Sequence, residues 1–181
     1  MNNSSHDYLN ANWTFWLSRR SPPGCDLYSY LSNLRFIYTV YDKETLNFVL
    51  NNIPRVGHIP NRFSYHFMRH KYRPCWEDEE NIKGGDWCVE CNKKISHDMW
   101  VQLLKLASSE NVSNFLSTDD KLIGVSISSR NSCDLIRLWN QNALRADQCR
   151  LLDYLKVTLP DVDWKSAKYN VHMFAVRTYQ L

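Results

Sequence analysis

Glycine, net charge and long apolar runs are all scarce in this sequence. Only five glycines occur in 181 residues, none of them in a phosphate-binding loop, and the formal net charge is +3. No apolar stretch approaches the roughly 20 residues that a transmembrane helix needs, and no secretory signal follows the polar start MNNSSHDYLN. We therefore expect a cytoplasmic protein. Because broad nucleic-acid-binding surfaces carry clustered basic residues, the low net charge indicates that any anionic partner is compact.

Regular cysteine and histidine patterns are missing as well. The six cysteines are irregularly spaced, which argues against a disulfide framework. Cys88 and Cys91 have a spacing that can hold zinc, but they fall in a predicted strand, where residues three apart point to opposite faces. His66 and His70 also fall in a predicted strand, with no Glu beside them. We expect no metal site and no cofactor.

A catalytic cysteine would need a base that activates its thiolate. His97 is the candidate base for Cys75 or Cys91, yet nothing near either cysteine in the sequence supports such a pair. We therefore expect a binding protein rather than an enzyme.

Aromatic residues are abundant, with seven Trp, ten Tyr and seven Phe, so some should lie on a binding surface. Tyr28 and Tyr30 fall in one predicted loop, and Trp76 falls in another, before the acidic run 77–80. Such rings could sandwich a flat ligand, and a carboxylate suits guanine, whose edge offers two N–H donors. If the guanine were methylated and cationic, cation–π attraction to the rings would strengthen its binding by up to about 2 kcal/mol. The alternative is that Trp76 packs half-buried and the acids are solvated.

Periodic patterns predict strands and helices in an order without βαβ repeats. We predict strands at 12–18, 33–40, 64–70, 86–91, 122–130, 132–140 and 168–176, and helices at 43–53, 96–107 and 144–158. Asp42 and Ser96 are the predicted N-caps, and Gly84-Gly85 is a turn signal. The pattern predicts an α+β fold with helices on one face of an antiparallel sheet. We expect a disordered tail at 1–8 and a single domain at 9–181.

The stretch WEDEENIKGGDW resembles the signature of the cap-binding eukaryotic initiation factor 4E family. NWTFW, SNLRFIYTV, the helix before NNIP, SHDMWVQLL and IGVSISSR followed by RLWN fall in the family's order and spacing. The similarity covers about residues 9–176. SYHFMRHKYRPCWEDEENIKGG resembles the divergent type-3 branch more than the principal factor.

This resemblance implies a curved eight-stranded antiparallel sheet, with three helices on its convex face and 7-methylguanosine in a concave slot. Trp76 matches a stacking aromatic, and Glu77 matches the carboxylate that takes N1–H and N2–H of the guanine. Trp139 matches the residue on the N7-methyl group, and Arg130 a phosphate contact. The other stacking position falls at Tyr30, with Tyr28 as a less favoured substitute.

Several positions depart from the family's pattern. Two basic positions of the phosphate cradle read Ser132 and Leu135, and a nearby arginine reads Asp86. Fewer cationic contacts to a triphosphate should weaken binding and flatten its salt dependence. Lys121 and Arg137 are possible replacements whose direction the sequence leaves open.

On the convex side, the family binds Tyr-x-x-x-x-Leu-Φ helices of initiation scaffolds and 4E-binding proteins. The matching positions read Lys43, Asn47, Val101 and Lys105, with Asn47 in place of a tryptophan. Because aromatic anchors usually carry the binding energy of such interfaces, we expect partner binding to be weaker than cap binding.

The sequence as a whole predicts a monomeric mRNA 5′-cap-binding protein of translation initiation or its regulation. The alternative is a cap-fold scaffold or translational repressor with weak cap affinity, acting through protein partners. The choice between activator and repressor stays open.

Overall fold

An antiparallel sheet organises the chain. The computed structural model describes residues 7–21 and 26–173, and within them seven strands lie in the order β2-β1-β3-β5-β6-β4-β7. Their bounds are β1 (Tyr8–Arg19), β2 (Leu34–Asp42), β3 (Phe63–Arg69), β4 (Gly85–Cys91), β5 (Leu122–Ser129), β6 (Asp134–Asn140) and β7 (Lys168–Val171). The α+β prediction is confirmed, with seven strands in this described part instead of the expected eight.

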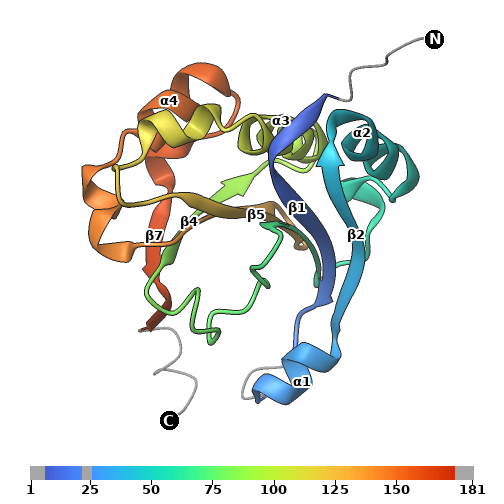
Figure 1. The fold of residues 1–181 in the computed structure, drawn as a ribbon. Helices are drawn as coiled ribbons and strands as arrows, with labels where there is room; N and C mark the ends of the chain where they lie inside the picture. The colour runs from blue at the N-terminus through green and yellow to red at the C-terminus, as the bar shows by residue number, and fades with distance from the viewer. Residues whose placement is uncertain (1–6, 22–25, 174–181) are drawn as a thin grey trace, which may run out of the picture.

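Three helices cover the convex face of the curved sheet (Figure 1). They are α2 (Lys43–Asn52), α3 (Ser96–Ser108) and α4 (Leu151–Thr158), and 3-10 turns lie at Val56–His58, Asn111–Phe115, Ala143–Gln148 and Trp164–Ser166. A fourth short helix, α1 (Leu27–Ser32), lies away from these three, where β1 passes into β2. The concave side therefore faces α1 and the loop between β3 and β4.

Alternation along each strand separates the core from the concave face. On β3, Tyr65 and Phe67 join the core under the helices, whereas His66 and Met68 point the other way. The core is rich in aromatics, and Trp13 stacks on Phe67 at a ring-centroid distance of 4.7 Å. The concave face carries the side chains that the core excludes, and it is where a site can be built.

The predicted helix starts fared differently. Asp42 caps α2 through a capping box with Thr45, as expected. Ser96, by contrast, is the first residue of α3 after the N-cap Ile95, and its hydroxyl donates to Asp134 Oδ2 at 2.7 Å. The cap prediction for Ser96 was wrong because a buried carboxylate on β6 takes its hydroxyl.

Two other local predictions need correction. The helix expected over 144–158 is divided into the 3-10 turn Ala143–Gln148 and α4. The segment with Tyr28 and Tyr30 is the helix α1 rather than a loop, because Asp26 caps it by accepting from the Ser29 N–H at 2.8 Å.

The pair Gly84-Gly85 owes its residue type to close packing. A Cβ on Gly84 would collide with the Asn140 carbonyl, and one on Gly85 would lie 2.5 Å from the Asn170 carbonyl. The pair marks the start of β4, wedged between β6 and β7, rather than a turn that needs positive φ.

Residues 1–6 of the expected tail and residues 174–176 of the last predicted strand lie outside the described residues. Asp7 and Tyr8 are described, and Tyr8 begins β1. Within the described ranges, none of the helices has the length and apolarity to cross a membrane.

Candidate functional site: the concave slot

The concave face carries its own apolar cluster, separate from the core. Met68, Tyr72, Ile123 and Trp139 are buried there, and Trp16 and Trp76 pack against them. We call these six residues the concave cluster. Three of its members are tryptophans from β1, β6 and the β3–β4 loop, so the face presents indole rings from three directions.

Trp76 is half-buried at the edge of this cluster. Its ring lies 6.5 Å from the ring of Trp139 at an interplanar angle of 37°, and it stacks on His172 at 6.2 Å and 22°. The guanidinium of Arg137 lies 5.7 Å from the Trp76 ring centroid. Trp76 is therefore half-buried, as the alternative interpretation of this residue as a packing residue predicted. It packs on the concave face rather than in the core.

The loop that carries Trp76 is held by internal hydrogen bonds. The buried amide of Asn81 donates to the carbonyls of Arg73 at 2.7 Å and Cys75 at 2.6 Å. Arg73 donates two hydrogen bonds to Asp78, at 2.9 and 2.7 Å. Asp78 is thus a structural member of the loop, and only Glu79 and Glu80 of the acidic run are exposed.

Glu77 is oriented by its neighbour Cys75. The Cys75 thiol donates to Glu77 Oε2 at 3.2 Å. Burial first, and then the hydrogen bond to Glu77, raise the pKa of Cys75 far above its usual value. The thiol therefore stays protonated, which makes it a donor to the carboxylate and unsuited to nucleophilic chemistry.

The two tyrosines of α1 have different environments. Tyr28 is 81% exposed, whereas the Tyr30 hydroxyl donates to the Pro74 carbonyl, two residues before Trp76. Burial is the main cause that raises the pKa of Tyr30. Of the pair, Tyr30 is the one that the fold brings to the Trp76 loop.

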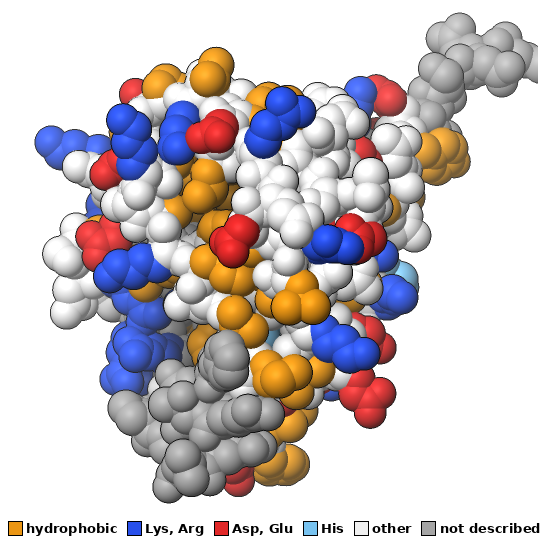
Figure 2. All heavy atoms as spheres, turned by 90° about the vertical axis from the view of Figure 1, so that its left-hand side faces the viewer, with side chains coloured by type: hydrophobic (Ala, Val, Ile, Leu, Met, Phe, Trp, Pro, Cys, Tyr) orange, Lys and Arg blue, Asp and Glu red, His pale blue; other side chains and the backbone are white. Residues whose placement is uncertain are grey.

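Arg130, the predicted phosphate contact, lies near other arginines. Arg130 follows β5, and burial together with the charges of Arg20 and Arg137 lowers its pKa. Ser132 is exposed and Leu135 half-buried. Figure 2, which faces the side with β7 and α4, shows basic and acidic side chains interspersed rather than one basic surface.

Arg137 is one of two basic residues whose direction sequence reasoning left open. The other is Lys121, whose Nζ lies 5.8 Å from the ring centroid of Tyr72 in the concave cluster. Arg137 Nη1 lies 2.5 Å from Oδ1 of the fully buried Asp86. Burial raises the pKa of Asp86, but His172 and the charge of Arg137 outweigh this and lower it overall. Strand alternation could have placed Arg137, because Ile136 and Leu138 belong to the core and leave residues 135, 137 and 139 on the concave face.

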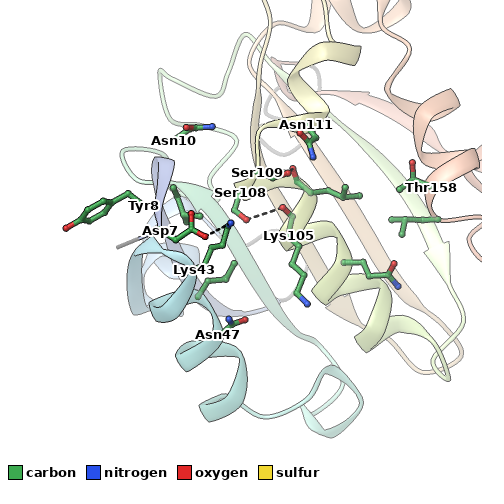
Figure 3. A pocket seen from close by; sticks show the side chains of 15 residues that line it. Asp7, Tyr8, Asn10, Lys43, Asn47, Lys105, Ser108, Ser109, Asn111 and Thr158 are labelled. Atoms are coloured by element: carbon green, nitrogen blue, oxygen red, sulfur yellow. Dashed lines mark hydrogen bonds and ion pairs between the residues drawn. The ribbon is translucent and has the colours of Figure 1, made fainter. Parts of the chain in front are cut away.

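The four predicted partner positions meet on the convex side. Lys43, Asn47 and Lys105 line a hollow of about 740 Å³ between β1, α2 and α3. Asn47, Val101 and Lys105 line a second hollow of about 350 Å³ beside it. In Figure 3 Lys43 and Asn47 project from α2 toward the Lys105 side of α3, and the dashed line to Asp7 is an ion pair of 2.6 Å.

The cysteine and histidine candidates are dispersed. Cys91 is buried in the core, whereas Cys88 lies on the other face of β4 and is half-buried. His97 accepts from the Val56 N–H at 3.4 Å, and His70 is exposed. In the described part of the chain, His, Cys, Asp and Glu side chains form no group of three that could hold a metal ion.

The fold and the concave cluster together define a class: a small α+β domain whose curved sheet carries tryptophans on its concave side, with the carboxylate of Glu77 on the adjoining loop. The family model described as eukaryotic initiation factor 4E matches residues 8–179, and the chain belongs to that family.

Relatives and solved structures agree with this membership. Eukaryotic translation initiation factor 4E of Eremothecium gossypii is 29% identical over 92% of this chain and 78% of that protein. Eukaryotic translation initiation factor NCBP of Arabidopsis thaliana is 30% identical over 75% of this chain and 59% of that protein. C. elegans eIF4E-3, in a complex with the 4E-binding protein Mextli and cap analog, has a TM-score of 0.82 at 22% identity over 96% of both chains. Ascaris suum eIF4E-3 with m7G cap has a TM-score of 0.77 at 23% identity over 92% of both chains. These likenesses confirm the expected fold.

Proposed function

We propose that this protein binds the 7-methylguanosine cap of mRNA in its concave slot and acts in translation initiation or its regulation. The observation that carries the proposal is the placement of Trp76 and Glu77 on one loop, which internal hydrogen bonds hold. Trp76 packs in the same cluster as Trp139, and the Tyr30 hydroxyl is hydrogen-bonded to the loop at the Pro74 carbonyl. Family membership supports it, as do the cap complexes of two eIF4E-3 structures with the same fold.

Each slot residue has a distinct role in this proposal. Trp76 and Tyr30 stack on the two faces of the methylated base, where a positive charge adds up to about 2 kcal/mol to stacking. Glu77 accepts N1–H and N2–H and thereby selects guanine. Trp139 packs on the N7-methyl group, and Arg130 and Arg137 face the phosphates.

The convex hollows are the proposed docking site for 4E-binding proteins or an initiation scaffold. The C. elegans relative was solved with such a protein, Mextli. Here the patch of Lys43, Asn47, Val101 and Lys105 is mostly polar, so an apolar peptide face finds few aromatic anchors. We therefore infer that this docking site is weak. We also infer that the protein is a cytoplasmic monomer with a single domain, residues 9–181, and that it binds its ligand without catalysing a reaction.

Retention on 7-methyl-GTP resin tests the cap proposal. We expect retention that free 7-methyl-GTP competes and GTP does not. Glu77→Ala should reduce affinity about 100-fold, since two charge-assisted hydrogen bonds are lost. Glu79→Ala, in the exposed part of the same acidic run, is the matched control and should bind normally. Equal retention of both variants would overturn the assigned guanine readout, and no retention of the wild type would favour the scaffold alternative.

A further inference from the structure

A row of buried polar side chains crosses the concave face of the sheet from β6 to β1. Trp139 Nε1 donates to Ser126 Oγ at 3.0 Å, and Ser126 Oγ lies 2.7 Å from His66 Nδ1. His66 Nε2 lies 2.8 Å from Ser18 Oγ. All four side chains are buried.

The row continues beyond β1. The Ser18 hydroxyl acts on the Tyr30 phenol as a hydrogen-bond donor, which opposes the rise in the Tyr30 pKa that burial causes. The Tyr30 hydroxyl donates to the Pro74 carbonyl. We call the series from Trp139 to Pro74 the relay. It links β6, β5, β3 and β1 to α1 and to the loop that carries Trp76.

The two ends of the relay fix the direction of every bond within it. An indole N–H can only donate, and a carbonyl can only accept. Between Trp139 and Pro74, five side chains each supply one hydrogen. Interatomic distances define four of the bonds, and we infer the fifth, from Ser18 to Tyr30, from its effect on the Tyr30 pKa. The only arrangement that uses each hydrogen once has Ser126 donate to His66 Nδ1, His66 Nε2–H donate to Ser18, and Ser18 donate to Tyr30.

From this geometry we infer that His66 is a positioning residue for cap binding, held as the neutral Nε2–H tautomer, through which the relay keeps Tyr30 and Trp139 in register. The inference rests on the proposed function, since its consequence is measured as cap affinity. A protonated imidazole would turn Nδ1 into a donor toward Ser126, and the Ser126 hydrogen would then have no acceptor within the relay.

Burial gives the relay its energetic weight. A buried hydroxyl or imidazole without a partner is costly, so each member holds its neighbours in place. Loss of His66 would leave Ser18 and Ser126 without the group between them. Ser18 would then lose the group that orients its hydroxyl toward the Tyr30 phenol, and Ser126 would hold Trp139 less firmly, so the positions of Tyr30 and Trp139 would loosen together.

The tautomer is the direct spectroscopic test. In the full-length protein with ¹⁵N-labelled histidine, long-range ¹H–¹⁵N spectra should show His66 with a protonated Nε2 and an unprotonated Nδ1 between pH 5 and pH 8. The Nδ1–H tautomer, or a protonated ring in this range, would overturn the assigned direction of the relay.

Cap affinity tests the positioning role. Titration with 7-methyl-GTP, followed by tryptophan fluorescence, should show about tenfold weaker binding for His66→Leu, which removes both hydrogen bonds. His66→Gln has an acceptor and a donor in one amide and should bind within about threefold of wild type.

A matched control lies two residues along the same strands. Ser64 Oγ and Ser128 Oγ share a buried hydrogen bond of 2.8 Å between β3 and β5, outside the relay. Ser128→Ala should lower stability without weakening cap binding. If it weakens binding as much as His66→Leu does, the relay has no special role and general softening of the sheet explains both.

Coupling between the ends completes the test. Tyr30→Phe and Ser126→Ala should be non-additive in cap affinity by about threefold, and this coupling should vanish in the His66→Leu background. If the wild type binds the cap but the effects of Tyr30→Phe and Ser126→Ala on affinity are additive, the proposed role of the relay is wrong and the proposed function stands. Absence of cap binding by the wild type would instead overturn the proposed function on which the relay's role rests.

Discussion

The concave slot and the convex hollows use polar residues in opposite ways. In the slot, His66, Ser126 and Asp86 are buried and hydrogen-bonded. Around the hollows, Lys43, Asn47 and Lys105 are exposed. Buried polar groups that are hydrogen-bonded to one another favour one geometry, whereas exposed long side chains lose rotamer entropy when a partner orders them.

This contrast agrees with the two proposals, a demanding cap site on one face of the sheet and a weak docking site on the other. A flat cationic base needs rings and a carboxylate fixed in advance, and preorganisation lowers the cost of binding it. A helical peptide needs an apolar groove with an aromatic anchor, which Asn47 does not provide. The two faces can therefore be changed independently, and each of the following variants alters one of them.

Trp76→Ala should have the largest effect. Loss of a stacking ring and its cation–π attraction should weaken 7-methyl-GTP binding about 100-fold. Fluorescence titration measures the affinity, and binding of a Tyr-x-x-x-x-Leu-Φ peptide serves as the convex control, which should not change. Loss of peptide binding would show that the two faces are coupled.

Asn47→Trp should strengthen the convex site. An aromatic anchor at an interface hot spot is worth about 2 kcal/mol or more, so peptide affinity should rise about 30-fold. Calorimetric titration of the peptide measures the gain, with cap affinity as the control. A wild-type protein that already binds the peptide as tightly as the variant would contradict the weak-site interpretation.

Acid should destabilise the slot through His66. Burial, and next the charge of Arg137, lower the pKa of His66 from 6.5 to about 3. Between these values the unfolded chain binds a proton that the folded protein does not, so this contribution to stability is present above pH 6.5 and is lost as the pH falls. Wild type should lose about 1.4 kcal/mol per pH unit more than His66→Gln in urea unfolding between pH 6 and pH 4. Parallel pH profiles would contradict the burial of a neutral imidazole.

Asp86→Asn should have the smallest effect on binding. The variant removes the charge paired with Arg137 but keeps a polar side chain, so affinity for the triphosphate should rise about threefold and depend more steeply on salt. Repeating the titration at several salt concentrations measures the slope. An unchanged slope would mean that Arg137 does not face the phosphates.

The sequence predicted the fold well where a pattern repeats. Alternation in NWTFW and NLRFIYTV predicted β1 and β2, and the stripe of Trp100, Leu103 and Leu104 predicted α3. Positions that depend on a distant partner could not be predicted from local patterns. Ser96 is claimed by Asp134, and Gly84 fits because the Asn140 carbonyl lies against it.

The site divides in the same manner. Local patterns identified Trp76, Glu77 and the pair Tyr28 and Tyr30. The resemblance favoured Tyr30 within that pair and supplied Arg130 and Trp139, and binding experiments can now test these candidates. The relay was beyond sequence reasoning, because Ser18, His66 and Ser126 come from three strands and mean little singly. Only the sheet register, which pairs residue 66 with residues 16 and 126, places them side by side.

The ion pair between Asp86 and Arg137 has a consequence for binding kinetics. Long-range steering of a polyanion depends on uncompensated charge around the binding site. Here the carboxylate of Asp86 compensates the charge of the Arg137 guanidinium. Capped RNA should therefore associate at a rate that varies little with ionic strength. The lifetime of the complex, which depends on the rings and the carboxylate proposed to hold the base, then decides how long a message stays bound.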